Sequence, residues 1–227
     1  LIALESVGQG LAALVAHDWG GAVAWSLANQ HPEALQQLVV INSPHPGPFL
    51  KALQTHPEQQ AASAYMLFLV QPDAASALAA NDFERLFGFL TGQDPLLTSL
   101  SAPAATATEP LPAWLTPEVK AQYREVWRHG LQGGLNYYRA SPLRPASAND
   151  PGTQAVQMAP EALRIDVPTL VLWAQNDVAL LPCLTEGLED HIASLRLVPI
   201  QGASHWVVHE QPNLVIAQLA AFLKPLQ

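Results

Sequence analysis

Cysteine and positive charge are both scarce in this chain, and each shortage excludes a class of protein. Cys183 is the single cysteine among 227 residues, so no internal disulfide can form and the chain suits a reducing compartment. Ten lysines and arginines stand against 19 aspartates and glutamates, which gives a formal net charge of −9. This balance argues against nucleic acid or an anionic membrane as a partner.

The sequence also lacks a long apolar run and a recognisable leader segment. No uninterrupted apolar stretch is long enough to span a bilayer, and no basic region followed by a short apolar segment stands at the start. We therefore expect a cytoplasmic protein with no membrane partner. Hydrophobic residues nevertheless make up 49% of the chain and charged residues only 13%, which is ample for a buried core.

One short segment, Ala16–Gly21 (AHDWGG), carries most of the chemical information. It follows an apolar run at Leu11–Val15 and precedes a helical pattern at Ala22–Leu27. A strand, a sharp turn and a helix in this order present the central residue, here Asp18, in a strained conformation, and small residues two positions away avoid a collision across the turn. The alternative is that Asp18 merely caps the following helix.

An aspartate at such a turn restricts the substrate. A carboxylate that attacks a saturated carbon leaves an ester, and an activated water can then attack the carbonyl of that ester. A serine attacking the same carbon would leave an ether, which water does not readily break. Asp18 therefore points to a small apolar substrate with an electrophilic sp3 carbon, either an epoxide or a haloalkane.

The order of the predicted elements indicates an α/β fold with an insertion. Strand-like apolar runs occur at residues 11–15, 38–42, 167–173 and 195–200, and an amphipathic helix is predicted from about Pro212 to Leu223. Between Phe49 and about Pro160 the pattern is helical and rich in loops. We predict a mostly parallel sheet flanked by helices, with a first core part at 1–48, a helical cap or lid at 49–160 and a second core part at 161–227.

His205 is the predicted base that activates water. It lies in Gly202–Trp206 (GASHW), a turn after the last strand and before the last helix. A histidine that comes last in the chain, after the acid, fits the order of catalytic groups in a hydrolase of this layout. Seven other histidines compete for the role, namely His17, His31, His45, His56, His129, His191 and His209.

Asp177 is the predicted acceptor that orients this base. It follows the strand that ends at Trp173, and catalytic groups of open α/β sheets gather at the carboxyl ends of strands. A plain turn aspartate is the alternative, and Asp166 and Asp190 are the nearest rivals. Asp166 precedes its strand and so falls at the wrong end of the sheet.

Together these motifs resemble the epoxide hydrolase and haloalkane dehalogenase branch of the α/β-hydrolase superfamily. The matching segments cover both core parts and are His17–Gly21, Asn42–Pro46, Asn176–Asp177, Gly202–Trp206 and Glu210–Pro212. The resemblance implies an α/β-hydrolase core, an Asp-His-Asp triad, and hydrolysis of an epoxide to a vicinal diol with a role in detoxification. It implies no metal or organic cofactor.

The resemblance also assigns roles outside the triad. Two lid tyrosines hold the oxygen of the opening epoxide, and Tyr65 and Tyr138 match their places. The backbone amide of Trp19 would stabilise the oxyanion. The haloalkane alternative would use the same triad and N–H donors for the departing halide, with Trp19 as one donor and Trp114 or Trp127 as another.

The family fold carries strands before the nucleophile turn and a His-Gly-x-Pro turn, and this sequence matches neither. We expect that a further N-terminal segment completes the sheet or that a homo-oligomer does so. A hypothesis of another class is a truncated, inactive hydrolase-like domain that acts in interaction.

Overall fold

The structure, a computed structural model, describes residues 10–93 and 111–223. The chain divides into two compact units, the first from residues 1–52 and 157–227 and the second from residues 53–156. The second unit is therefore an insertion between two parts of the first. A lid function for the predicted cap, residues 49–160, stays a prediction.

A parallel sheet organises the first unit. Its described strands lie in the order β1-β2-β3-β4, and each pairs with its neighbour in parallel. Their bounds are β1 Leu14–His17, β2 Leu38–Ile41, β3 Thr169–Ala174 and β4 Leu195–Ile200. β2 and β3 are buried along their whole length, as their unbroken apolar runs predict. β1 runs from Leu14 to His17 instead of the predicted Leu11–Val15, and it ends directly before Asp18.

The register of the sheet brings the ends of the strands to one edge. His17 at the end of β1 pairs with Ile41 at the end of β2, and Ile41 pairs with Leu172 near the end of β3. Ala174 at the end of β3 pairs with Ile200 at the end of β4. The segments that follow these strands therefore leave the sheet side by side.

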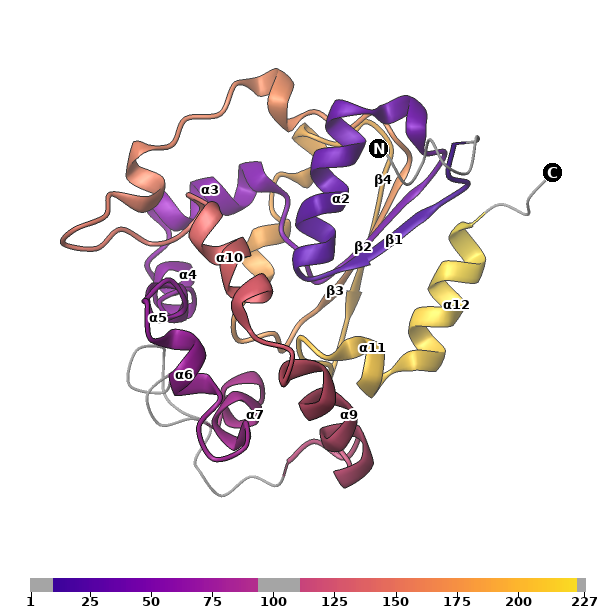
Figure 1. Ribbon diagram of the computed structural model, residues 1–227. Coiled ribbons are helices and arrows are strands. Elements are labelled where there is room, and N and C mark those ends of the chain that lie inside the picture. Colours follow the sequence, from indigo (N-terminus) through magenta and orange to yellow (C-terminus); the bar gives the residue numbers. More distant parts are fainter. Residues whose placement is uncertain (1–9, 94–110, 224–227) are drawn as a thin grey trace. The chain divides into compact units, whose positions relative to one another are not determined.

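Helices cover both faces of this sheet (Figure 1). Helix α2, Trp19–Gln30, lies on one face, while α11, Val207–Glu210, and α12, Pro212–Phe222, lie on the other. Helix α2 turns four buried residues inward, namely Gly21, Ala24, Trp25 and Ala28. On the opposite face the core joins side chains of β2 and β3 to α11 and α12 through Val39, Ile41, Leu170, Leu172, Val207 and Val215.

Shorter elements complete the first unit. Helix α3 begins in it and runs into the second unit, and the remaining elements are short 3-10 turns. Their bounds are η1 Pro32–Ala34, α3 Pro46–Thr55, η3 Pro160–Leu163, η4 Pro182–Thr185 and η5 Leu188–Asp190.

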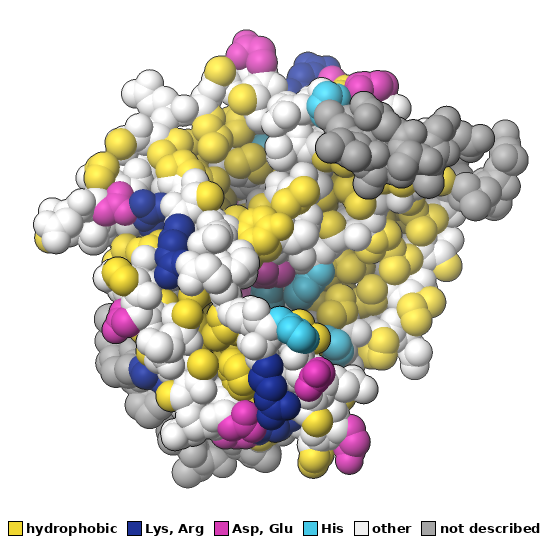
Figure 2. Space-filling view, viewed as in Figure 1, with side chains coloured by type: hydrophobic (Ala, Val, Ile, Leu, Met, Phe, Trp, Pro, Cys, Tyr) yellow, Lys and Arg dark blue, Asp and Glu magenta, His cyan; other side chains and the backbone are white. Residues whose placement is uncertain are grey.

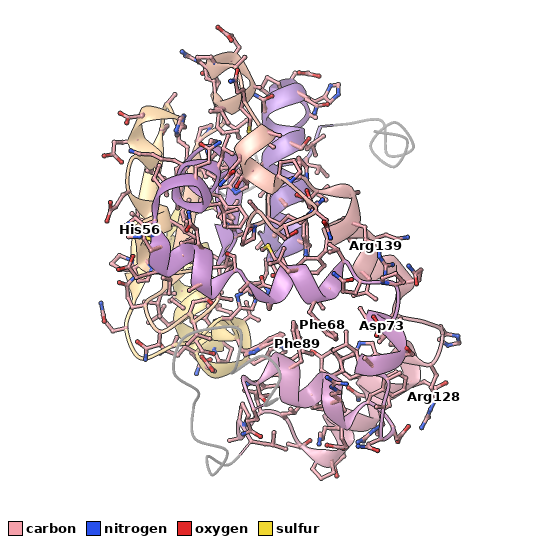
Figure 3. The ribbon with its side chains drawn as sticks, turned by 90° about the vertical axis from the view of Figure 1, so that its left-hand side faces the viewer. His56, Phe68, Asp73, Phe89, Arg128 and Arg139 are labelled. Carbon is pink, nitrogen blue, oxygen red and sulfur yellow. The ribbon has the colours of Figure 1, made fainter. Side chains whose placement is uncertain are left out.

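The regular elements of the second unit are all helices among its described residues, and one isolated antiparallel bridge joins Ser147 and Asp150. Its elements are α4 Pro57–Ala62, α5 Tyr65–Leu69, α6 Ala74–Leu78, α7 Glu84–Leu90, α9 Pro117–Trp127, α10 Gln132–Ala140 and η2 Gly152–Ala155. Leu69, Phe87 and Leu135 lie in its buried cluster, and Phe68 and Phe89 pack against it (Figure 3). Arg139 of α10 donates to the carbonyl oxygens of Val70 and Gln71, just after the end of α5. Its guanidinium thus ties α10 to the turn that follows α5.

A bilayer crossing needs a helix of about 20 apolar residues. Helix α2 reaches 12 residues and α9 and α12 reach 11 each. Within the described ranges, no helix is long and apolar enough to cross a membrane.

Helix α2 approaches the loop after β2 so closely that one position requires glycine. A Cβ placed on Gly21 would lie 2.3 Å from the Cβ of Ser43 and 2.4 Å from its hydroxyl oxygen. A Cβ on Gly20 would meet only the Cβ of Ala16, at an ordinary 3.9 Å. The small residues expected across the turn, Ala16 and Gly20, therefore have room to spare, and the tight contact lies one residue further along.

We predict opposite effects of alanine at these adjacent glycines. Gly21→Ala should destabilise the protein by about 1–3 kcal/mol, because the added methyl overpacks the contact with Ser43. Gly20→Ala should be neutral or stabilise by up to about 1 kcal/mol, because it removes backbone freedom from the unfolded chain without a clash. Urea unfolding of both variants measures the difference. Equal stabilities would contradict the close approach of α2 to the β2 loop.

Candidate active site

Asp18 occupies the sharp turn between β1 and α2 in a strained conformation. Its φ is 52° and its ψ is −128°, and a non-glycine residue held there costs about 1–3 kcal/mol. Its carbonyl accepts the first hydrogen bonds of α2 from Gly21 and Ala22. Its carboxylate makes no capping hydrogen bond to the helix, so the simple cap alternative does not describe this side chain.

His205 lies between two carboxylates. Its Nε2 is 3.1 Å from Oδ1 of Asp18, and its Nδ1 is 2.7 Å from Oδ2 of Asp177. It stands in the loop between β4 and α11, at the edge where the strands end. The structure therefore brings the predicted nucleophile, base and acid into one hydrogen-bonded line. Histidine side chains gather near the middle of the face seen in Figure 2.

Asp177 is the most firmly held member of this line. Its side chain has no exposed surface. Oδ1 accepts hydrogen bonds from the amides of Ala179 and Leu180, each at 2.9 Å. Oδ2 accepts from His205 and also from Nδ2 of Asn42, at 2.9 Å. Four donors thus fix the orientation of a buried carboxylate.

The structure adds Asn42 to this site, a residue whose contact with Asp177 the sequence did not predict. It follows β2, is fully buried, and has a left-handed φ of 39°. Its Nδ2 donates to Asp177 while its Oδ1 accepts from the amide of Ala174, at 3.1 Å. A polar residue directly after a buried strand was the available signal, because groups at the carboxyl ends of parallel strands converge.

The electrostatics of the line favour an ion triplet in the resting state. Burial disfavours a charged His205, but hydrogen bonds and attraction from Asp177 and Asp18 outweigh it and raise the pKa of His205 to about 10. Burial also disfavours a charged Asp18, yet the hydrogen bond and charge of His205 lower the pKa of that carboxyl. An imidazolium between two carboxylates follows at neutral pH.

The predicted tyrosines form a pair in the second unit. Tyr65 begins α5 and Tyr138 lies in α10, and their ring centroids are 6.2 Å apart with planes at 77°. Trp19 is the first residue of α2, directly after Asp18. Asp18, His205 and Asp177 belong to the first unit, so the structure assembles the triad and the tyrosine pair each within its own unit.

The structure places other candidates for the base and the acid in different environments from His205 and Asp177. Asp166 forms an exposed ion pair with Arg164. His45 is buried and stacks on His191, with ring centroids 4.8 Å apart, and burial together with His191 lowers the pKa of His45 to about 3. His17 donates to the backbone of His205. Among the described residues, no group of three His, Cys, Asp or Glu side chains is placed to hold a metal ion.

Comparison with known proteins agrees with this fold. The alpha/beta hydrolase fold family matches residues 1–212. The AB hydrolase superfamily protein YfhM of Bacillus subtilis is 32% identical over 217 residues, which are 94% of this chain and 66% of that protein. Epoxide hydrolase 4 of Homo sapiens is 29% identical over 228 residues, with 97% of this chain and 56% of that protein covered. The chain thus spans between about half and two thirds of these curated relatives.

A solved structure extends the comparison. It is described as one of the novel epoxide hydrolases of the alpha/beta hydrolases superfamily from metagenomes of hot environments. It is 33% identical to this chain, with a TM-score of 0.73. The match covers 98% of this chain and 70% of that protein. The chain belongs to the α/β-hydrolase fold family, in the branch that contains epoxide hydrolases.

The raised pKa of His205 predicts a pH-dependent contribution to stability. Its pKa is about 10 in the folded protein and near the ordinary 6.5 when unfolded. Protonation of His205 in the folded protein therefore stabilises it fully below the pKa of the unfolded chain. This stabilisation is lost as the pH rises toward about 10. We expect the free energy of unfolding to exceed that of His205→Gln most at about pH 6 and least above about pH 10.

Urea unfolding of both proteins across this range measures the effect. His209→Gln, at an exposed histidine nearby, serves as the matched control. A difference between wild type and His205→Gln that does not change with pH would contradict the ion triplet.

The variant Asn42→Asp tests the hydrogen bond from the Asn42 amide to Asp177. Aspartate also tolerates the left-handed backbone, so the change mainly places a second buried carboxylate against Oδ2 of Asp177. Like charges raise the pKa of the buried pair above the unfolded value, so the cost is absent in acid and grows as the pH rises above about 4. We expect a loss of about 1–3 kcal/mol at neutral pH, measured by urea unfolding.

The double variant Asn42→Asp/Asp177→Asn should recover part of that loss, because it restores one carboxylate and one amide. A single variant as stable as wild type at neutral pH would show that the Asn42 amide does not support the acid.

Proposed function

We propose that this chain carries the active site of an epoxide hydrolase, which converts a small apolar epoxide to a vicinal diol through an ester on Asp18. The observation that carries the proposal is the line from strained Asp18 through His205 to Asp177, with contacts of 3.1 and 2.7 Å. The similarity to epoxide hydrolases supports the substrate class.

In the first step, a carboxylate oxygen of Asp18 attacks an epoxide carbon. The carbon–oxygen bond of the ring breaks, and its electron pair goes to the departing oxygen. Tyr65 and Tyr138 are proposed to hold this oxygen and supply its proton, a contribution of about 10²–10⁴ in rate for a positioned acid. Their ring centroids lie 6.2 Å apart, so the two tyrosines are neighbours within the second unit.

In the second step, water attacks the carbonyl carbon of the ester. Neutral His205 takes the proton of the water, and Asp177 stabilises the imidazolium that forms. The amide of Trp19 is proposed to bind the oxyanion of the tetrahedral intermediate. Collapse of the intermediate breaks the bond between the acyl carbon and the alkyl oxygen, and that oxygen takes the proton of the added hydroxyl. The diol then leaves, the Asp18 carboxylate is restored, and His205 is again protonated as in the resting site. The tyrosine regains its proton from solvent, which received one from His205 after ester formation.

Ester formation itself prepares the base for the second step. In the resting site Asp18 is one of the two carboxylates that hold the pKa of His205 at about 10. An ester at Asp18 carries no charge and is a weaker acceptor, so its support for the imidazolium is lost. The pKa of His205 then falls, and the imidazole can become the neutral base that the hydrolysis requires.

We predict that His205→Ala traps the ester. Without the base, attack by Asp18 on the epoxide can proceed while hydrolysis of the ester stalls, so the variant should gain the mass of one epoxide on the peptide that contains Asp18. Intact-mass measurement and peptide mapping after incubation with an epoxide, and separately with a bromoalkane, identify both the residue and the reagent.

Asp18→Asn is the control and should gain no mass from either reagent. An adduct from the bromoalkane but not from the epoxide would replace the proposal with haloalkane dehalogenation. No adduct from either reagent on a folded protein would overturn the assignment of Asp18 as nucleophile.

A further inference from the structure

His17 connects the strand of the proposed nucleophile to the loop of the proposed base. It is the last residue of β1 and precedes Asp18 directly. Its side chain reaches across to the backbone of His205, where its Nε2 lies 2.9 Å from the carbonyl oxygen. A carbonyl oxygen can only accept, so the Nε2 of His17 carries the hydrogen and donates.

The rings of the two histidines also pack together. Their centroids are 4.7 Å apart with planes tilted by 41°. Trp206 contacts the His205 ring edge-on, with centroids 5.4 Å apart, and lies 6.4 Å from the His17 ring. His205 is therefore held at its backbone by a hydrogen bond and at its ring by aromatic neighbours.

One anchor of His205, the Asp18 carboxylate, is lost during the proposed reaction. In the resting site its Nε2 faces Asp18, but an ester there no longer offers a carboxylate oxygen. Asp177 still binds Nδ1, and Ser204 is still tied to Glu210 through its amide at 2.7 Å and its hydroxyl at 2.6 Å. The His17 hydrogen bond secures the backbone of residue 205 itself, next to the reacting centre.

We infer that His17 is a positioning residue for ester hydrolysis: its Nε2–H group holds the His205 carbonyl so that the imidazole stays aligned after Asp18 has been esterified. The inference rests on the proposed function and adds a residue to it. His17 touches no reacting atom and acts through His205 alone.

The protonation state of His17 is consistent with this part. Burial lowers the pKa of His17, and the positive charge of His205 lowers it further, while Asp18 and Asp177 oppose the shift. A neutral His17 with its hydrogen on Nε2 makes the required bond. A second proton would place like charges in two rings 4.7 Å apart.

Two substitutions separate the hydrogen bond from the ring contact. His17→Phe keeps an aromatic ring and removes the donor, whereas His17→Gln keeps an N–H donor of similar reach and removes the ring. Stopped-flow and quenched-flow measurements with an epoxide, followed by mass spectrometry of the Asp18 peptide, give the rates of ester formation and ester hydrolysis separately. His31→Phe is the matched control for loss of a histidine outside the site.

We expect His17→Phe to slow ester hydrolysis by about 10- to 100-fold, because small misplacements of a catalytic group have effects of this size. Ester formation should change far less, so the ester accumulates. His17→Gln should recover most of the hydrolysis rate. In ¹⁵N NMR spectra of the wild-type protein, the His17 ring should show the neutral tautomer with its hydrogen on Nε2.

The outcomes distinguish this inference from the proposed function. If wild type turns over the epoxide and His205→Ala accumulates the ester, but folded His17→Phe hydrolyses it at the wild-type rate, the positioning role of His17 is overturned and the function stands. Equal losses in both half-reactions, or a His17→Gln variant as slow as His17→Phe, would also overturn it. If wild type forms no ester from the epoxide, both fail together.

Discussion

The shared imidazole of His205 is the interaction on which the rest of this site depends. Its two nitrogens contact Asp18 and Asp177, which come from the ends of β1 and β3, while His205 itself follows β4. Three segments distant in sequence meet there because parallel strands in register end at one edge of the sheet. The sheet thus determines the distances of 3.1 Å from His205 to Asp18 and 2.7 Å from His205 to Asp177.

The same interaction balances burial against charge. Burial alone would lower the pKa of His205, and the flanking carboxylates reverse that effect and raise it to about 10. A base with such a pKa is protonated at neutral pH and cannot accept a proton from water. The two carboxylates are not equivalent, however, since Asp177 is buried and held by four donors whereas Asp18 is partly exposed. The proposed ester at Asp18 would therefore change the charge state of His205 while Asp177 still fixes the orientation of its ring.

Much of the fold was predictable from the sequence because its signals are local. The apolar runs, interrupted in β4 by Arg196, predicted β2, β3 and β4 to within two residues at each end, and the turn at Asp18 was marked by its neighbours. Asn42 and His17 were visible as residues but not in their contacts, since their partners lie 135 and 188 residues away. The need for glycine at position 21 likewise depends on Ser43 across the interface between α2 and the β2 loop. No local pattern encodes such contacts.

The strained backbone of Asp18 and the hydrogen bond of His17 both help to fix the position of the Asp18 side chain. A left-handed turn between a strand and a helix leaves the central side chain displayed at the sheet edge, but it also makes the position of that side chain depend on both flanking elements. Gly21 lets α2 pack against the β2 loop, and His17 ties the end of β1 to the His205 loop. The strained residue is therefore fixed from both sides, and the energy stored in its backbone cannot relax without breaking one of these contacts. The proximity of Asp18 and His205, the proposed nucleophile and base, is then a property of the packed sheet and not of the turn alone.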